Sequence, residues 1–363
     1  MRRTHFDTLQ PICPRCALDG RGQHKLYIAS VFGEAGEIIV SGIIECADKA
    51  CPMAYPIIDG VPIIVPNVAE YIASCQAQIL QREPLNEDLR SLVSDAIGPN
   101  TEFDQMRQHL SIYCWGHYAD LDPAEVPRQP QSAIATLLED CAADTLPLSA
   151  PSIDLGCSVG RSSFELAATT TGMVLGVDLN FAMLRKAQKI LIDRKLSYER
   201  RRIGIVYDRR AYPVELPNAE LVDFWACDIL ALPFGGGLFN SALALNVFDC
   251  VNSPASFLAV LQGLLAGGGK AVIATPYDWT PGATPVENWI GGHSQRQELA
   301  GSAEAMLRRL LNEQSGSSAT AELEIKHEVD AARWLTRLHD RSTVHYQAHA
   351  IVLQKKQAPT EGF

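Results

Sequence analysis

The sequence predicts an α/β protein with a parallel sheet, preceded by a helical segment and a small β-rich module. Across residues 148–357, short apolar runs alternate with amphipathic stretches of helical length, a pattern typical of parallel strands joined by helices. Across residues 1–66, shorter apolar runs are separated by glycine, proline and two pairs of cysteines, which is typical of small hairpins. Residues 67–147 carry apolar positions at helical spacing, so we expect three parts in all.

Length and composition exclude several classes of protein. The chain has 363 residues, 47% of them hydrophobic and 20% charged, enough for a large core plus an appendage. No apolar run reaches the roughly 18–20 residues of a transmembrane helix. The first residues lack the apolar stretch of a secretory signal, so we expect a cytoplasmic protein without a membrane partner. The net charge of −11 argues against a non-specific nucleic-acid partner.

The β-rich module carries two close cysteine pairs. Their spacings are C-x2-C and, thirty residues later, C-x4-C. Four thiolates can surround a zinc ion as a tetrahedron, which leaves no open position for catalysis. A segment this short has too little core to fold without such a staple, although four free cysteines remain the alternative. We therefore expect a structural zinc site formed by Cys13, Cys16, Cys46 and Cys51.

Helices and strands are expected in a definite order after the module. The helical segment should contain helices near 68–80, 102–118 and 133–143, and should cover the following domain. In that domain, strands are expected at 152–155, 173–177, 223–226, 241–245, 271–274, 323–329 and 344–353. The helices between them should lie at 162–168, 181–194, 254–265 and 303–313.

Glycines and acids stand where the predicted strands end. Residues 154–160 read Asp-Leu-Gly-Cys-Ser-Val-Gly, and glycines at such a turn let a ligand approach the backbone. Asp178 ends the second strand, where an acid can accept hydrogen bonds from ribose hydroxyls. The third strand leads into a polar–apolar pair suited to the edge and face of adenine. The candidate residues are Asp154, Gly156, Cys157, Ser158, Gly160, Asp178, Leu179, Asp228, Ile229 and Asn246.

These motifs, in this order, resemble those of class I S-adenosylmethionine-dependent methyltransferases. The resemblance implies a Rossmann-like sheet of seven strands that binds S-adenosylmethionine. It places residues 154–160 around the amino-acid end of this methyl donor, Asp178 at its ribose and Asp228-Ile229 at its adenine. A nicotinamide cofactor would instead favour G-x-G-x-x-G, and this chain has Ser158 at the middle glycine. The cysteine module, with residues 55–62 (Tyr-Pro-Ile-Ile-Asp-Gly-Val-Pro), resembles a zinc ribbon that accompanies several methyltransferases and implies a scaffold or a docking site for a protein partner.

Further motifs bear on the methyl acceptor. They are Tyr-Cys-Trp-Gly-His-Tyr at 113–118, Asn-x-x-Asp at 246–249, Pro-Tyr-Asp-Trp at 276–279 followed by Trp-Ile-Gly-Gly at 289–292, and Trp-x-x-Arg-x-His-x-Arg at 334–341. Together they resemble the methyltransferase domain of ovothiol-forming enzymes, which methylates a ring nitrogen of a thiol-bearing histidine. The resemblance implies an imidazole acceptor held by Tyr113, His117, Asn246 and Tyr277, with Trp279 beside it and Arg341 on its carboxylate.

This chain differs from the ovothiol-forming family in two ways, so several methyl acceptors are compatible with the sequence. In front of the methyltransferase part, a zinc ribbon is expected instead of the synthase domain of that family, and residues 185–210 form an insertion with ten Lys or Arg in 26 residues. The acceptor is therefore a thiohistidine, its selenium counterpart or another imidazole. One alternative is an RNA base methyltransferase with a zinc-ribbon recognition module, in which the basic insertion contacts RNA rather than forming a solvated helix and loop. The other is a donor-binding scaffold without catalysis.

Overall fold

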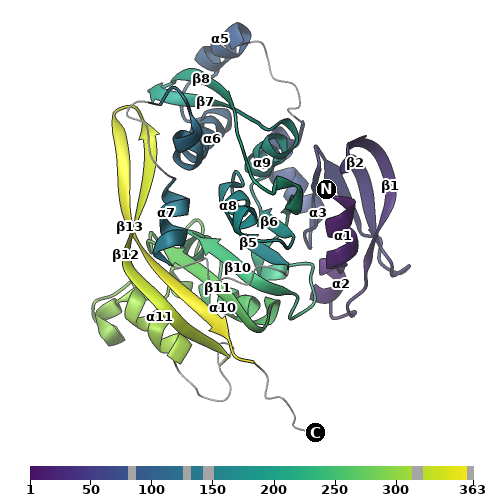
Figure 1. Cartoon of the computed structure of the whole chain (residues 1–363), viewed down its shortest axis with the longest axis vertical. Helices are drawn as coiled ribbons and strands as arrows, with labels where there is room; N and C mark the ends of the chain where they lie inside the picture. Colours follow the sequence, from purple (N-terminus) through teal and green to yellow (C-terminus); the bar gives the residue numbers. More distant parts are fainter. Residues whose placement is uncertain (81–86, 126–131, 142–150, 313–321, 358–363) are drawn as a thin grey trace.

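A seven-stranded sheet forms the centre of the molecule. The computed structural model describes residues 1–80, 87–125, 132–141, 151–312 and 322–357. The strands of the central sheet follow the order β12-β13-β11-β10-β5-β6-β9. The N-terminal module lies at one side of this sheet, and the long β12–β13 hairpin lies at the opposite side (Figure 1). Within the described ranges, no helix has the length and apolar character needed to span a membrane.

The predicted strands are confirmed as members of this sheet. Five of them pair in parallel: β5 (Ser152–Leu155), β6 (Val174–Asp178), β9 (Val222–Ala226), β10 (Phe239–Leu245) and β11 (Leu265–Thr275). β13 (Ser342–Lys355) pairs antiparallel with both β11 and β12 (Leu323–His339). β12 is ten residues longer than expected at its end, because it continues as a hairpin with β13 beyond the edge of the central strands.

The helices between these strands lie near the predicted ranges: α8 (Arg161–Thr169), α9 (Phe181–Asp193), α10 (Pro254–Leu264) and α11 (Ala303–Asn312). Local signals explain their ends. The Asn180 side chain accepts a hydrogen bond from the Met183 N–H and caps α9, which ends where Arg194 adopts a left-handed conformation. The expected last residue of α11, 313, lies outside the described residues.

The segment before β5 is helical, with α3 (Val68–Ser74), α4 (Gln76–Leu80), α5 (Glu87–Ile97), α6 (Glu102–Tyr118) and α7 (Ala133–Asp140). α6 packs against β7 and β12, and α7 also packs against β12. The proposed boundary at 147/148 and the expected end of the last helix, 142–143, fall outside the described residues. α6 and α7 therefore cover the hairpin side of the sheet, whereas α4 packs against α9.

The basic insertion has a different structure from the expected helix and loop. Its first residues belong to α9, but the rest forms a two-stranded sheet of β7 (Lys195–Ile203) and β8 (Val206–Pro213). Alternation along β7 buries Leu196 and Tyr198, so a strand with one buried face was hidden among the charges.

The N-terminal module is a four-stranded sheet with two short helices that the sequence did not predict. The strands are β1 (Leu26–Ala35), β2 (Ile38–Cys46), β3 (Ala54–Ile58) and β4 (Val61–Pro62), and the helices are α1 (Arg3–Leu9) and α2 (Pro14–Leu18). Ile63 forms a parallel bridge to Ala226, and the Ile64 N–H donates to the Ala226 carbonyl (2.9 Å). The Arg2 N–H donates to Asp223 Oδ2 (2.8 Å). The module thus covers the free edge of β9.

Candidate active site

The loop between β5 and α8 has the shape of a ligand cradle. Gly156 and Gly160 have φ angles of 78° and 84°, and Ser158 between them has φ 51°. A Cβ at Gly156 would lie 2.7 Å from Val247 Cγ2, so no side chain fits there. The next residue, Cys157, is fully buried, and its N–H donates to the Val177 carbonyl (3.0 Å). The loop therefore presents its backbone, rather than side chains, to a ligand bound at the end of the sheet.

Asp154 stabilises this loop from beneath. Its carboxylate Oδ2 accepts hydrogen bonds from the hydroxyls of Ser162 and Ser163, each at 2.6 Å. Burial raises the pKa of Asp154 to about 6, although the two hydroxyl hydrogen bonds oppose the shift. Asp154 is 1% exposed. Because both hydroxyls belong to the first turn of α8, Asp154 orients the start of this helix.

Asp178 connects the loop to the end of β6. Its Oδ2 accepts from the Ser158 N–H (2.8 Å) and its Oδ1 from the Asn180 N–H (2.8 Å). The following residue, Leu179, is exposed, and its carbonyl accepts from the hydroxyl of Tyr71 on α3 (2.9 Å). Tyr71 thus places the helical segment beside the acid, a contact that no sequence motif indicated.

The other two strand ends complete the candidate nucleoside site. Asp228 Oδ1 accepts from the Leu230 N–H (2.9 Å), and Ile229 next to it is buried. Asn246, with φ 55°, donates its N–H to the Ala274 carbonyl (2.7 Å). Among the described residues, Asn246 Oδ1 is a buried oxygen without a hydrogen-bond partner. An orphaned amide oxygen at the carboxyl ends of parallel strands fits a bound polar ligand.

Helix α6 is clamped over the loop. The Tyr118 hydroxyl donates to the Val159 carbonyl (2.9 Å). Arg161, the first residue of α8, donates to the His117 carbonyl (2.8 Å) and forms a bidentate ion pair with Asp120 (2.8 Å). A bidentate pair with 6% and 8% exposed side chains holds a fixed geometry. The last turns of α6 are therefore held above the cradle.

Tyr113 and His117 lie four residues apart on α6, so their rings share one face of this helix. Their ring centroids are 5.6 Å apart, and the His117 ring lies 6.1 Å from that of Trp334 on β12, both edge to face. Burial, then the charge of Arg161, lowers the pKa of His117 to about 3, so this imidazole is neutral near pH 7. Burial raises the pKa of Tyr113 to about 12, and the Asp178 and Asp249 charges act in the same direction. Tyr113 thus lies between the candidate nucleoside site and the region after β10.

Tyr277 lies directly after β11 with φ 54°. Its hydroxyl bonds to Nδ1 of His349 on β13 (2.6 Å), an interaction that the sequence did not predict. Trp279 lies in an aromatic cluster, 6.1 Å from Trp289 in a stacked arrangement and 6.2 Å from Phe248. Its indole Nε1 is a buried nitrogen without a partner in the part of the chain that the structure describes. Both residues therefore border the same end of the sheet.

Comparison with known proteins identifies the central domain. Residues 153–273 match the family model described as a methyltransferase domain, a range that contains the cradle, Asp178, Asp228 and Asn246. This part of the chain is a class I S-adenosylmethionine-dependent methyltransferase domain. A search of the curated proteins found no match.

Several solved structures are similar in general fold to this methyltransferase. An S-adenosylmethionine-dependent methyltransferase from Methanosarcina mazei is 17% identical and aligns over 60% of this chain and 97% of its own, with a TM-score of 0.37. Phosphoethanolamine N-methyltransferase 2 of Haemonchus contortus is 14% identical over 63% and 44%, with a TM-score of 0.37. A complex of the Haloferax volcanii Trm112 methyltransferase activator and a methyltransferase is 14% identical over 61% and 90%, again with a TM-score of 0.37. Likenesses at this level say nothing about the acceptor.

Two acidic residues, Asp249 and Asp278, lie close together after β10 and β11, and the sequence motifs contained them without indicating a role. Asp249 is 2% exposed, its Oδ2 accepts from the Asp278 N–H (2.7 Å), and its Oδ1 is buried without a partner among the described residues. Burial raises the pKa of Asp249. The Tyr346 hydroxyl donates to Asp278 Oδ2 (3.0 Å). Tyr346 lies between the exposed residues His345 and Gln347 on β13, a pattern that gave no functional signal.

Arg341 does not lie near Asp249, Asp278 and Tyr346. It is exposed at the tip of the β12–β13 hairpin, where its N–H donates to His339 Nδ1 (3.2 Å). At about 3.3 Å per residue, it lies roughly 16 Å along the strand from Tyr346. The expected contact of Arg341 with a substrate carboxylate is therefore not supported, because the chain turns back only after β12 has left the sheet.

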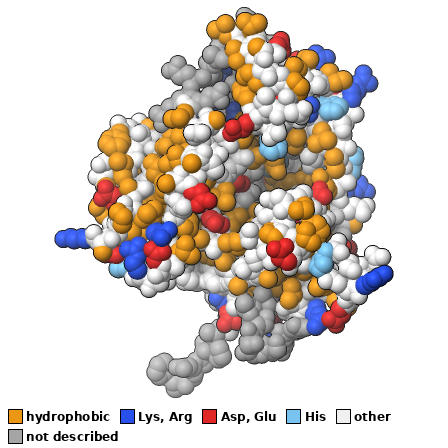
Figure 2. All heavy atoms as spheres, turned by 180° about the vertical axis from the view of Figure 1, so that it is seen from behind, with side chains coloured by type: hydrophobic (Ala, Val, Ile, Leu, Met, Phe, Trp, Pro, Cys, Tyr) orange, Lys and Arg blue, Asp and Glu red, His pale blue; other side chains and the backbone are white. Residues whose placement is uncertain are grey.

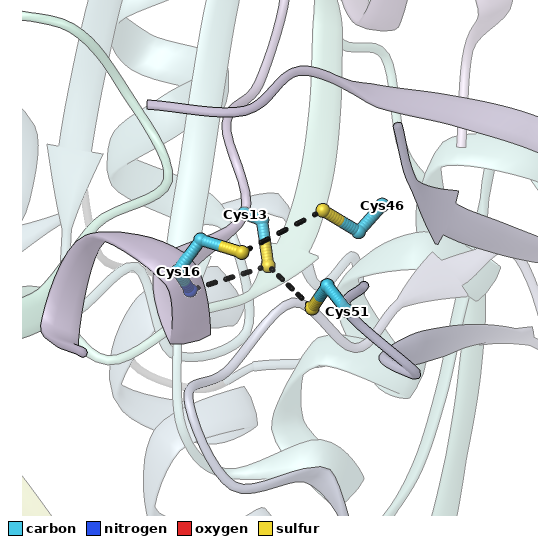
Figure 3. Close-up of side chains that lie close together, drawn as sticks. All are labelled: Cys13, Cys16, Cys46 and Cys51. Carbon is cyan, nitrogen blue, oxygen red and sulfur yellow. Dashed lines mark hydrogen bonds between the residues drawn. The ribbon is translucent and has the colours of Figure 1, made fainter. Parts of the chain in front are cut away.

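The four predicted zinc ligands of the methyltransferase meet in the N-terminal module (Figure 3). Their sulfurs lie within 4.8 Å of one another, with Sγ–Sγ distances of 3.9 Å for Cys13–Cys51 and 3.7 Å for Cys16–Cys46. Four sulfurs at about 2.3 Å from one zinc ion are about 3.8 Å apart, so the geometry fits the metal. The Cys16 N–H and the Tyr55 hydroxyl both contact Cys13 Sγ. All four cysteines are buried.

Proposed function

We propose that this enzyme transfers a methyl group from S-adenosylmethionine to a ring nitrogen of a small imidazole. The substrate class that the motifs favour is a histidine derivative bearing a thiol or a selenol, as in ovothiol-type biosynthesis. In this proposal Asp178, Asp228 and Asn246 hold the methyl donor, which supplies an electrophilic methyl group. Tyr113, His117 and Tyr277 surround the acceptor, with Trp279 as the apolar wall behind it.

The observation that carries the proposal is the clamped helix α6. α6 is tied to the cradle through Tyr118 and Arg161, and its Tyr113 and His117 rings contact each other edge to face. In this proposal the two rings lie beside the bound donor. The face opposite to that of Figure 1 is hollowed below the α5 end of the molecule, with hydrophobic side chains inside the hollow and acidic ones at its edge (Figure 2). A hollow with apolar side chains suits a small molecule, since it can position a neutral nitrogen.

The acidic group adds to this interpretation. The charge of Asp249 acts on Tyr113, and Asp278 Oδ2 accepts a hydrogen bond from the Tyr346 hydroxyl. Asp249 Oδ1 has no hydrogen-bond partner within the described residues. A buried carboxylate oxygen without a donor favours a ligand that carries an ammonium group. Histidine derivatives have such a group at their α-carbon.

The charges of the basic insertion argue against the RNA alternative. At least five of its ten basic residues form ion pairs with acids: Arg185 with Asp59, Lys189 with Asp193, Arg200 with Glu125, Arg202 with Asp208, and Arg210 with Asp122. Several of these pairs join the hairpin to the segment after α6. Arginines that neutralise neighbouring acids add little to phosphate binding. The insertion therefore helps to hold the segment that covers the candidate site.

We further propose that the four cysteines bind one structural zinc ion and that the module is a scaffold for the edge of β9. On its far side, β1 exposes Phe32 (67%), which a protein partner could cover.

The test is product analysis by mass spectrometry. The full-length enzyme is incubated with S-adenosylmethionine and a panel of histidine, thiohistidines, selenohistidines and bulk RNA. We expect a gain of one methyl group on an imidazole ring and none on RNA. Methylation of RNA alone would overturn the acceptor assignment, and donor binding without turnover on any substrate would favour the scaffold alternative.

A further inference from the structure

We propose that Tyr277, His349 and Glu328 form a proton relay that removes the proton released when the acceptor nitrogen is methylated. The inference rests on the proposed function, because it names residues that act on the same acceptor. Tyr277 would be the catalytic residue that touches the acceptor. His349 and Glu328 would act through it as positioning residues.

The three side chains form one continuous chain of hydrogen bonds that runs from the segment after β11 to β13 and β12. The Tyr277 hydroxyl lies 2.6 Å from His349 Nδ1, and His349 Nε2 lies 2.5 Å from Glu328 Oε1. The same Oε1 accepts from Arg308 Nε on α11 (2.6 Å). His349 is 2% exposed and pairs with Thr275 in the β11–β13 register, which fixes its ring behind Tyr277.

These contacts determine the direction of proton transfer. A carboxylate only accepts hydrogen bonds, so Nε2 of His349 carries a proton toward Glu328. In the neutral ring, Nδ1 then has a free lone pair and accepts from the Tyr277 hydroxyl. The lone pairs of the Tyr277 oxygen remain available to an acceptor N–H. An acid behind a histidine, which in turn contacts a hydroxyl, is an arrangement that holds the imidazole in one tautomer.

Charged groups face this chain from every neighbouring element. Glu304 and Arg308 on α11, Glu328 on β12 and Asp249 before β11 act on Tyr277. Burial raises the pKa of Tyr277 well above its usual range, so its hydroxyl stays protonated. Burial also opposes ionisation of Glu328, but hydrogen bonds from His349 and Arg308 outweigh it and lower the pKa of this carboxyl. The chain thus ends in a carboxylate.

The same cluster is not a metal site. Glu328, Asp330 and His349 lie close enough to share an ion, with ligand atoms within 4.8 Å of one another. However, Arg308 already forms ion pairs with both acids, each at 2.6 Å. A guanidinium between the two carboxylates supplies the positive charge that a cation would bring. A relay therefore accounts for the cluster better than a metal does.

Methylation of a neutral imidazole releases one proton, and this relay gives that proton a place to go. The acceptor's pyridine-type nitrogen forms the new C–N bond while the C–S bond of the donor breaks and leaves a thioether. The methylated ring is then a cation with one N–H. That proton passes to the Tyr277 oxygen as the Tyr277 proton passes to His349 Nδ1, and the resulting imidazolium is paired with Glu328. No other reactant is needed.

The experiment compares His349→Gln and Glu328→Gln with the wild-type enzyme, with His345→Gln as the control on the same strand, where His345 is exposed. We expect His349→Gln to lower kcat about 100-fold, the scale of one general base, with little change in donor affinity or acceptor KM. Glu328→Gln should give a smaller loss. The kcat of His349→Gln should keep rising with pH where the wild type has reached a plateau. An equal loss at every pH would mean a structural role and would overturn the relay.

A second measurement does not depend on the acceptor. Histidine nitrogen NMR of the uniformly ¹⁵N-labelled enzyme, assigned with His349→Gln, should show the Nε2–H tautomer and a shift of Nδ1 in Tyr277→Phe. If no imidazole is a substrate, the proposed function fails, while the NMR result still decides whether the hydrogen-bonded chain exists. If the wild type methylates imidazoles but the relay variants match it, the relay fails and the function stands.

Discussion

Replacing Asp178 with alanine tests the donor site most directly. The carboxylate of Asp178 accepts the Ser158 and Asn180 N–H groups at 2.8 Å each. In the proposed donor site it also accepts hydrogen bonds from the ribose hydroxyls. Losing hydrogen bonds to a charged acceptor costs about 1.5–3 kcal/mol. Asp178→Ala should therefore raise the Kd for S-adenosylmethionine by roughly 10- to 150-fold. Ser158 also adopts φ 51°, so the loop loses the bond that maintains an unfavourable backbone conformation.

Isothermal titration calorimetry at neutral pH measures this change. Asp228→Ala is the matched control, since the Asp228 side chain accepts from the Leu230 N–H in its own turn and should face only the adenine. We expect a smaller loss of affinity there. Thermal denaturation of both variants shows whether the fold is retained. An unchanged Kd for folded Asp178→Ala would mean that the nucleoside site has been misplaced.

Three further predictions concern other parts of the molecule. Elemental analysis should find about one zinc per chain, and Cys13→Ser should lose the metal and loosen the N-terminal module, because metal binding and folding are coupled; folded, metal-free wild type would contradict this. Gly156→Ala should weaken donor binding by roughly tenfold in calorimetry, since a left-handed conformation costs an L-residue about 1–2 kcal/mol and its Cβ would meet Val247. The lowered pKa of His117, about 3, means that the unfolded chain takes up a proton near pH 6.5 that the folded protein refuses, so stability is full above pH 6.5 and falls as the pH drops toward 3. Between pH 6.5 and pH 5, the free energy of unfolding measured in urea should therefore fall by about 2 kcal/mol less in His117→Gln than in the wild type. An equal fall in both proteins would show that His117 is protonated in the folded state.

The sequence alone was sufficient for the central domain. Residues 174–177 (Val-Leu-Gly-Val) and 242–245 (Ala-Leu-Ala-Leu) are buried at every position, and these continuous apolar runs are visible without a structure. Because ligands of parallel sheets bind at the carboxyl ends of strands, the residues that follow these runs could be assigned to the candidate donor site. The cysteine pairs were similarly informative, since their spacing alone determines which ligands a tetrahedral ion can use.

Tertiary structure alone decided what the charged and aromatic residues outside these strands do. Arg210 is paired with Asp122, 88 residues earlier, and His349 is paired with Glu328 through the register of a hairpin. Local periodicity indicates which side of a strand is buried, but it does not indicate which distant partner faces it, since that depends on strand order and register. For the same reason the sequence placed Arg341 at the acceptor and missed His349, whose position behind Tyr277 exists only once β13 has paired with β11.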